Sequence, residues 1–179
     1  MVRGRRGAAM TPIDDDLFIK LRAFVLALYP SGMEVIQGLG NNVPMPAGPF
    51  VCMTALNQRA LSTNHESYDV TLQRVVTRPT EYSIQVDCYG DQASNVATTL
   101  STLWRDPYGC DAMEPIAAPL YASDPIQMPL VNGEENYEHR WTFTALLQFN
   151  PSVTVPQQSA DTLNLDLVSV DAEFPPTEG

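Results

Sequence analysis

EYSIQVDCYGDQASNVATTLSTLW, residues 81–104, is the stretch that decides the fold. Up to Tyr89, apolar and polar side chains alternate, which predicts a strand with one buried face. Gly90 ends this alternation, with Asp91 as the expected cap of a helix. The apolar side chains that follow recur at helical spacing: Ala93, Val96, Ala97, Leu100, Leu103 and Trp104. A strand followed directly by a helix predicts helices layered on an antiparallel sheet.

A first helix is expected over residues 11–29. Thr11 caps it, Pro12 takes the first helical position, and the carboxylates of residues 14–16 lie where the helix dipole favours anions. Its apolar positions also follow helical spacing: Ile13, Leu17, Leu21, Phe24 and Leu28.

Further strands are predicted over 33–37, 50–56, 67–77, 126–131 and 140–149, and residues 57–66 are expected to be a polar connection. Strand 67–77 alternates and is expected to form an antiparallel hairpin with 81–89. Asn132-Gly133 is a strong signal for a second hairpin, which joins 126–131 to 140–149. Residues 106–125 have little periodicity and many breakers, and we expect them to be irregular.

These elements predict an α+β fold, in which two helices flank an antiparallel or mixed β-sheet, with an added β-hairpin and a C-terminal extended arm. The length of 179 residues suits one domain. We expect a disordered basic tail over 1–10, a single domain over 11–156, and an arm with a mobile end over 157–179. In that arm Leu163, Leu165 and Leu167 alternate with polar residues.

The charge is strongly acidic and unevenly distributed. Ten basic residues stand against 21 acidic ones, a net charge of −11. This excludes a protein that wraps duplex DNA or docks on anionic membranes, because both need clustered basic charge. From Cys110 onward Arg140 is the only basic residue, against eleven carboxylates. No apolar run approaches the ~20 residues that span a bilayer, and no signal peptide is recognised.

No constellation for catalysis or metal binding stands out. Cys52, Cys88 and Cys110 have no CxxC spacing and are expected to be buried free thiols of a reducing compartment. His65 and His139 are isolated and expected to be exposed. The sequence has no nucleophile elbow and no complete glycine-rich nucleotide loop. We therefore expect no enzyme, no catalytic residues, no cofactor and no metal.

Three groups of residues are candidates for contact surfaces. The stretch 23–29 is apolar all round, so Phe24 and Leu28, together with the arm leucines, are candidate subunit contacts. Leu120 and Tyr121 fall in a breaker-rich loop that either meets a partner or folds back on its own domain. The third group consists of carboxylates in the expected hairpin, which either are simply exposed to solvent or have a function that depends on their charge: Glu134, Glu135 and Glu138.

An ordered set of segments between about Ile36 and Pro156 resembles the neck (tail terminator) protein family of tailed bacteriophages. Each fragment alone is weak, and the ordered set is fairly specific. The segments are VIQGLGNNVP (35–44), FVCMT (50–54), YSIQVDCYG (82–90), LWRD (103–106), LYASDP (120–125), RWT (140–142) and LQFNP (147–151).

The resemblance implies a virion structural protein assembled in the host cytoplasm. Such subunits form a hexameric ring that caps the tail tube, joins the tail to the head connector and, in contractile tails, meets the sheath. Genomic DNA passes through the lumen, where carboxylates such as those of the 134–138 hairpin would repel phosphates. The alternatives are a tail-tube subunit, a head-completion adaptor, or a small enzyme with an unrecognised site.

Overall fold

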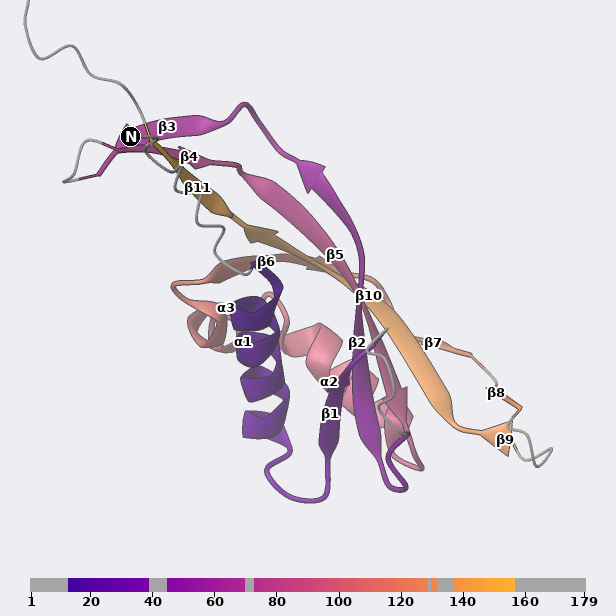
Figure 1. Ribbon diagram of the computed structural model, residues 1–179. Coiled ribbons are helices and arrows are strands. Elements are labelled where there is room, and N and C mark those ends of the chain that lie inside the picture. Colours follow the sequence, from indigo (N-terminus) through magenta and orange to yellow (C-terminus); the bar gives the residue numbers. More distant parts are fainter. Residues whose placement is uncertain (1–12, 39–44, 70–72, 129, 132–136, 157–179) are drawn as a thin grey trace, which may run out of the picture.

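A twisted mixed sheet organises the molecule. The computed structural model describes residues 13–38, 45–69, 73–128, 130–131 and 137–156 (Figure 1). The strand order of the main sheet is β1-β2-β5-β10-β6, and β7 also pairs with β10. Only the β1–β2 pair is parallel among these pairings. The strands are β1 (Glu34–Gln37), β2 (Phe50–Ala60), β5 (Thr80–Tyr89), β6 (Ala117–Ala122), β7 (Ile126–Gln127) and β10 (Arg140–Phe149).

Helices gather on one side of this sheet (Figure 1). They are α1 (Ile13–Leu28), α2 (Ala93–Leu103) and α3 (Pro107–Met113). The first two confirm the expected helices, and the α+β class is confirmed. The expectation of an irregular 106–125 is wrong, because this stretch contains α3 and β6. Asp106 caps α3, its Oδ1 accepting from the backbone N–H of Tyr108 at 3.0 Å, and Pro107 sits in the first turn.

The core lies between the helices and the covered face of the sheet. The apolar side chains that alternate along β5 and β10 form one side of the core, as the sequence predicted. The apolar side chains at helical spacing form the other side. The Trp104 indole N–H donates to the Leu146 carbonyl at 3.0 Å, which satisfies the polar atom of a nearly buried ring. The core side chains include Leu17, Leu21, Phe24, Met53, Ile84, Val86, Leu100, Trp104, Phe143 and Leu147.

The start of α2 differs from the expectation. Asp91 is not its cap; Gln92 occupies that position and makes no side-chain capping hydrogen bond. Gly90, with φ of +108°, turns the chain from β5 toward the helix.

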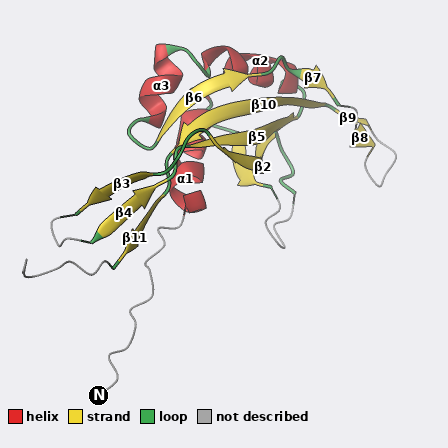
Figure 2. Ribbon diagram, turned by 90° about the horizontal axis from the view of Figure 1, so that it is seen from above, coloured by secondary structure: helices red, strands yellow, loops and turns green. Residues whose placement is uncertain are grey.

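A second, three-stranded sheet projects from the first and is called the ribbon here (Figure 2). It consists of β3 (His65–Tyr68), β4 (Arg74–Thr77) and β11 (Ser152–Val155), in the order β11-β4-β3. The prediction of one strand over 67–77, paired with 81–89, is wrong. The Asp69 carboxylate accepts from the backbone N–H of Gln73 at 2.9 Å, at a turn between β3 and β4.

Other boundaries also move. The expected polar connection 57–66 is mostly strand, since β2 continues to Ala60 and β3 begins at His65. Against β5, the register of β2 shifts between Ala55 and Asn57, and β10 shifts against β6 between Leu146 and Leu147. Both shifts are irregularities of the bulge type, which bend a strand.

The expected strand 126–131 is divided. β7 pairs with β10, whereas β8 (Leu130–Val131) pairs antiparallel with β9 (Tyr137–Glu138). This β8–β9 hairpin and the ribbon lie at opposite ends of the molecule (Figures 1 and 2). Asn132-Gly133, the basic tail and the C-terminal arm lie outside the described residues.

Candidate functional site

A closed ion-pair network lies on the sheet face that the helices leave uncovered. Arg140 donates from Nε and Nη2 to Asp87 Oδ1 at 3.2 and 3.0 Å, and Gln85 Nε2 donates to Asp87 Oδ2 at 2.8 Å. The Asp87 side chain is only 5% exposed. Both carboxylate oxygens are thus occupied by donors, which suits a structural role and leaves the carboxylate poorly placed for acid–base chemistry.

Aromatic rings extend this network. The Arg140 guanidinium carbon lies 5.6 Å from the centre of the Tyr89 ring. That ring stacks on Phe50, with 4.3 Å between centroids and 10° between planes. A chain of contacts therefore joins β2, β5 and β10 across the open face of the sheet.

The cysteines are free thiols, as expected. Cys88 is buried, whereas Cys52 and Cys110 are only partly buried. Burial, aided by the Asp87 charge, raises the pKa of Cys88 to about 12. Desolvation also raises the pKa of Cys52. Because the thiolate is the reactive form, neither thiol is activated as a nucleophile or metal ligand at neutral pH.

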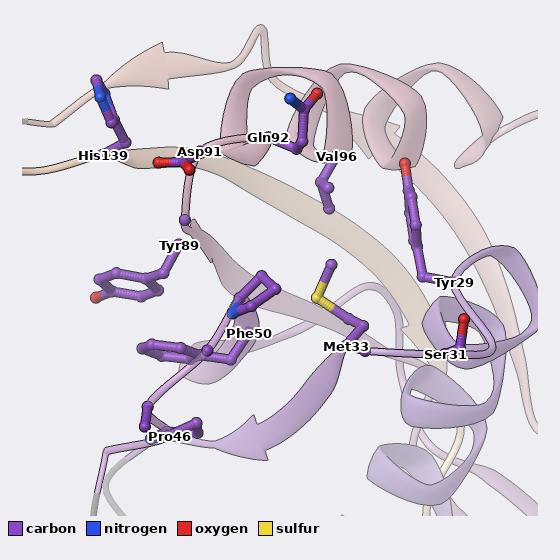
Figure 3. Close-up of a pocket in the computed structure, with 15 residues that line it drawn as sticks. Tyr29, Ser31, Met33, Pro46, Phe50, Tyr89, Asp91, Gln92, Val96 and His139 are labelled. Atoms are coloured by element: carbon purple, nitrogen blue, oxygen red, sulfur yellow. The ribbon is translucent and has the colours of Figure 1, made fainter.

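An open cleft of about 760 Å³ lies at one end of the main sheet. Figure 3 shows Tyr29 and Ser31 on one side of it and Asp91 and His139 on the other, with Met33 between them. The polar side chains come from opposite walls and do not converge, so they form no acid–base pair with a common target.

The described residues contain no group of three His, Cys, Asp or Glu side chains that would hold a metal ion. His65 lies on β3 and His139 between β9 and β10, and both are exposed. Within the described parts of the chain, no helix is long and apolar enough to cross a membrane.

The structure places two of the predicted contact residues in or near the core. Phe24 is 3% exposed, and its ring centroid lies 6.1 Å from that of Trp104 and 6.2 Å from that of Tyr108. It therefore has little surface left for another subunit. Leu28 is partly buried and packs against the same core.

Leu120 and Tyr121 lie on strand β6, so the expectation of a loop here is wrong. The β-sheet position is set by pairing with β10, where Tyr121 is opposite Leu146. Tyr121 is 55% exposed and remains available for contact. The arm leucines 163, 165 and 167 and the carboxylates of 134 and 135 lie outside the described residues, and Glu138 is placed only by its backbone on β9.

Sequence reasoning missed the ribbon and an open edge beside α1. The ribbon had a local signal in Asp69 and Gln73, whose spacing permits a side-chain-closed turn. The open edge had none, because it forms where Ile19 of α1 meets Ile36 of β1.

Comparison with known proteins identifies a family. A family model described as phage neck terminator protein matches residues 15–173. The match extends beyond the 36–156 span of the resemblance to include most of α1 and the arm leucines. A search of curated proteins finds no match. Since the model covers well over half of the 179 residues, the chain belongs to the phage neck terminator protein family.

Proposed function

We propose that this neck protein is a tail terminator that forms a ring, caps the tail tube and joins the tail to the head connector. The observation that carries the proposal is the family match over residues 15–173, which spans the main sheet, the ribbon, the β8–β9 hairpin and the described helices apart from the first residues of α1. The neck of the virion is the location that family membership gives. Ring formation, the hexameric number and the contacts with tube, connector and sheath are the finer part of the proposal.

The two ends of the subunit differ from each other, which supports assembly through two different surfaces. The ribbon and the β8–β9 hairpin project from opposite ends of a body whose core is closed on itself (Figures 1 and 2). A ring needs two different patches on each subunit, one meeting the other on the next copy. Tyr121, exposed on the edge strand β6, is a candidate contact with the tube or connector.

The acidic charge fits a channel that DNA must traverse without binding. The net charge is −11, and we assign a lumen position to Glu134, Glu135 and Glu138 of the β8–β9 hairpin. Carboxylates facing a phosphate backbone repel it, and the repulsion weakens within about one Debye length, roughly 8 Å in physiological salt. Assembly in the host cytoplasm accords with three free thiols.

The terminator role is tested in the phage or prophage that encodes the chain. A nonsense mutation in the gene is expected to give overlong tails of variable length that do not join heads, and the full-length chain supplied from a plasmid restores virions. Negative-stain imaging measures tail length, and a labelled antibody on wild-type virions is expected to mark a single band at the neck. Label along the whole tube identifies a tube subunit, and normal detached tails beside incomplete heads identify a head-completion protein; either result overturns the proposal.

The lumen charge is tested by neutralising the three hairpin carboxylates: Glu134→Gln, Glu135→Gln and Glu138→Gln. We expect normal particles that eject DNA more slowly, with the difference shrinking as salt rises. The matched control neutralises three exposed carboxylates of the body: Asp111→Asn, Glu114→Gln and Asp124→Asn. Equal ejection rates for both triple variants would place the hairpin away from the channel.

A further inference from the structure

Strand β1 is an open edge of the main sheet. Within the described residues it pairs only with β2, and it stands at the end of the strand order. Glu34 N–H donates to the Pro49 carbonyl at 3.3 Å, and Gly38 N–H to the Met53 carbonyl at 2.7 Å. In a parallel ladder, peptide groups alternate between the two neighbours, so those of Val35 and Gln37 face outward. Such an edge is a template for one more strand.

An apolar groove of about 300 Å³ accompanies this edge. Phe18 and Ile19 of α1 form one wall and β1 the other, and Figure 1 shows α1 and β1 close together. Ile19 is 64% exposed and extends the apolar surface of the groove. Arg22 adds a cation at the rim.

We propose that residues 163–167 of a second copy, Leu-Asn-Leu-Asp-Leu, add to β1 as a further strand. The alternating leucines then all face the helix side, where they cover Ile19 and fill the groove, while Asn164 and Asp166 face the polar side of the sheet. Five residues in a strand span about 17 Å, enough to pair along all four residues of β1. The inference rests on the proposed ring, for which it names the contact between neighbours.

Charge favours this occupant. Residues 157–179 carry five carboxylates and no basic side chain. The receiving helix carries three aspartates in its first turn and two cations, of which Lys20 donates to the Glu114 carbonyl and Arg22 lines the groove. The acidic arm is attracted to the Arg22 guanidinium at the groove, which favours its encounter with this part of the edge.

The geometry of the chain points to a neighbour's groove and away from its own. The arm begins after β11, in the ribbon, and β1 pairs with the opposite end of β2, at residues 50–53. From Val155 at the end of β11 to the level of Gln37, the path along the strands is six residues to Phe149 and six more from Thr80 to Val86, about 40 Å at about 3.3 Å per residue. The eight residue steps from Val155 to Leu163 reach at most about 29 Å. Figure 1 shows the ribbon pointing away from β1, so an arm leaving it is directed to another subunit.

Cross-linking between two differently tagged copies tests the proposal. One full-length copy carries Glu34→Cys on the open edge, and the other carries Asn164→Cys in the arm; both positions lie off the leucine face. A short bismaleimide is expected to join the two copies at least tenfold more than it joins Asn164→Cys to a copy with Gln58→Cys, an exposed control at the other end of β2. The reaction is run on the purified chain and on the chain bound to tail tubes.

Matched substitutions decide whether the leucines cause the cross-link. Leu165→Asp in the arm copy, or Ile19→Asp in the edge copy, is expected to reduce it to the control level. Ser169→Asp adds the same charge outside the segment and should leave it unchanged. Cross-linking at the control level in both settings, persistence with Leu165→Asp, or linkage only within one chain that carries both cysteines overturns the inference.

The outcomes separate this contact from the terminator role. A chain that marks the neck and limits tail length but shows no cross-link overturns the contact alone. A chain that cross-links through these positions but marks the whole tube or the head overturns the terminator role alone.

Discussion

The main sheet and the ribbon are both sheets of hydrogen-bonded strands, but they differ in what covers them. In the main sheet, Ile84 and Ala145 are 0% exposed beneath the helices. In the ribbon, every residue of β3 is exposed and those of β4 and β11 are only half-buried. In both regions, each inner strand is hydrogen-bonded to a neighbouring strand on either side. We therefore expect the hydrophobic layer, and not the backbone ladder, to hold most of the subunit's stability.

The largest effect is expected from the core of the main sheet. Ile84→Ala should lower the free energy of unfolding by about 3–4 kcal/mol, because it removes buried methyl groups and leaves a cavity. Denaturant unfolding measures it. The matched control is Ile126→Ala, at a side chain 56% exposed, which should change stability by less than about 0.5 kcal/mol. Equal losses at the two positions would contradict a stability centred on β5.

A buried and an exposed ion pair, both within the main sheet, should differ next. Arg140→Met leaves the buried Asp87 carboxylate without its main partner and should cost about 2–3 kcal/mol. Arg59→Met removes a pair with Glu81 in which the arginine is 70% exposed, and should cost less than about 1 kcal/mol. Thermal or denaturant unfolding compares the two variants. A cost for Arg59→Met as large as that for Arg140→Met would refute the distinction.

A smaller effect is expected at the turn from β5 into α2. Gly90→Ala should cost about 1–2 kcal/mol, because φ is +108° and a Cβ there would lie 3.0 Å from the Pro49 Cβ. Gly48→Ala is the control, since a Cβ there meets nothing within 4 Å. If both variants unfold at the same denaturant concentration, the turn is not strained by a side chain.

The last test changes no residue. Amide hydrogens of β3 and β4 are expected to exchange at least about 100-fold faster than those of β5 in the isolated subunit, since an uncovered sheet opens without unfolding the core. Hydrogen-exchange mass spectrometry resolves the two segments. Equal protection of the amide hydrogens in the two segments would mean that the ribbon unfolds together with the main sheet.

The sequence predicted those elements whose pattern is local. The alternation of Tyr82, Ile84 and Val86 and the helical spacing through Leu100 were enough for β5 and α2. The ribbon was missed because 67–77 keeps its alternation straight through the turn that Asp69 closes. Helix α3 was missed because seven residues are too few for periodicity, although Asp106-Pro107 was a capping signal.

The surfaces were less predictable, for a physical reason. Asp87 lies among the polar positions that alternate with the apolar ones along β5, a pattern that predicts exposure to solvent. It is nevertheless buried, and it is bound by Arg140, which lies 53 residues further along the chain. The groove beside β1 likewise depends on Ile19 and Ile36, which no periodic pattern brings together. The family itself was recognisable from short ordered segments, because these do not need the contacts between them to be known.

The shift of register at Ala55–Asn57 has a consequence for how this protein can change length. Leu56, 51% exposed, is the surplus residue, since Ala55 lies opposite Ile84 and Asn57 opposite Ser83. Because Leu56 has no partner on β5, removing it would leave Asn57 opposite Ser83 and the outer half of β2 on its present faces, whereas removing one paired residue shifts the register and turns over the side chains beyond it. An insertion or deletion beyond it preserves the faces only when its length is even. The body can therefore lose the surplus residue Leu56 without changing which face of the sheet the outer side chains of β2 occupy.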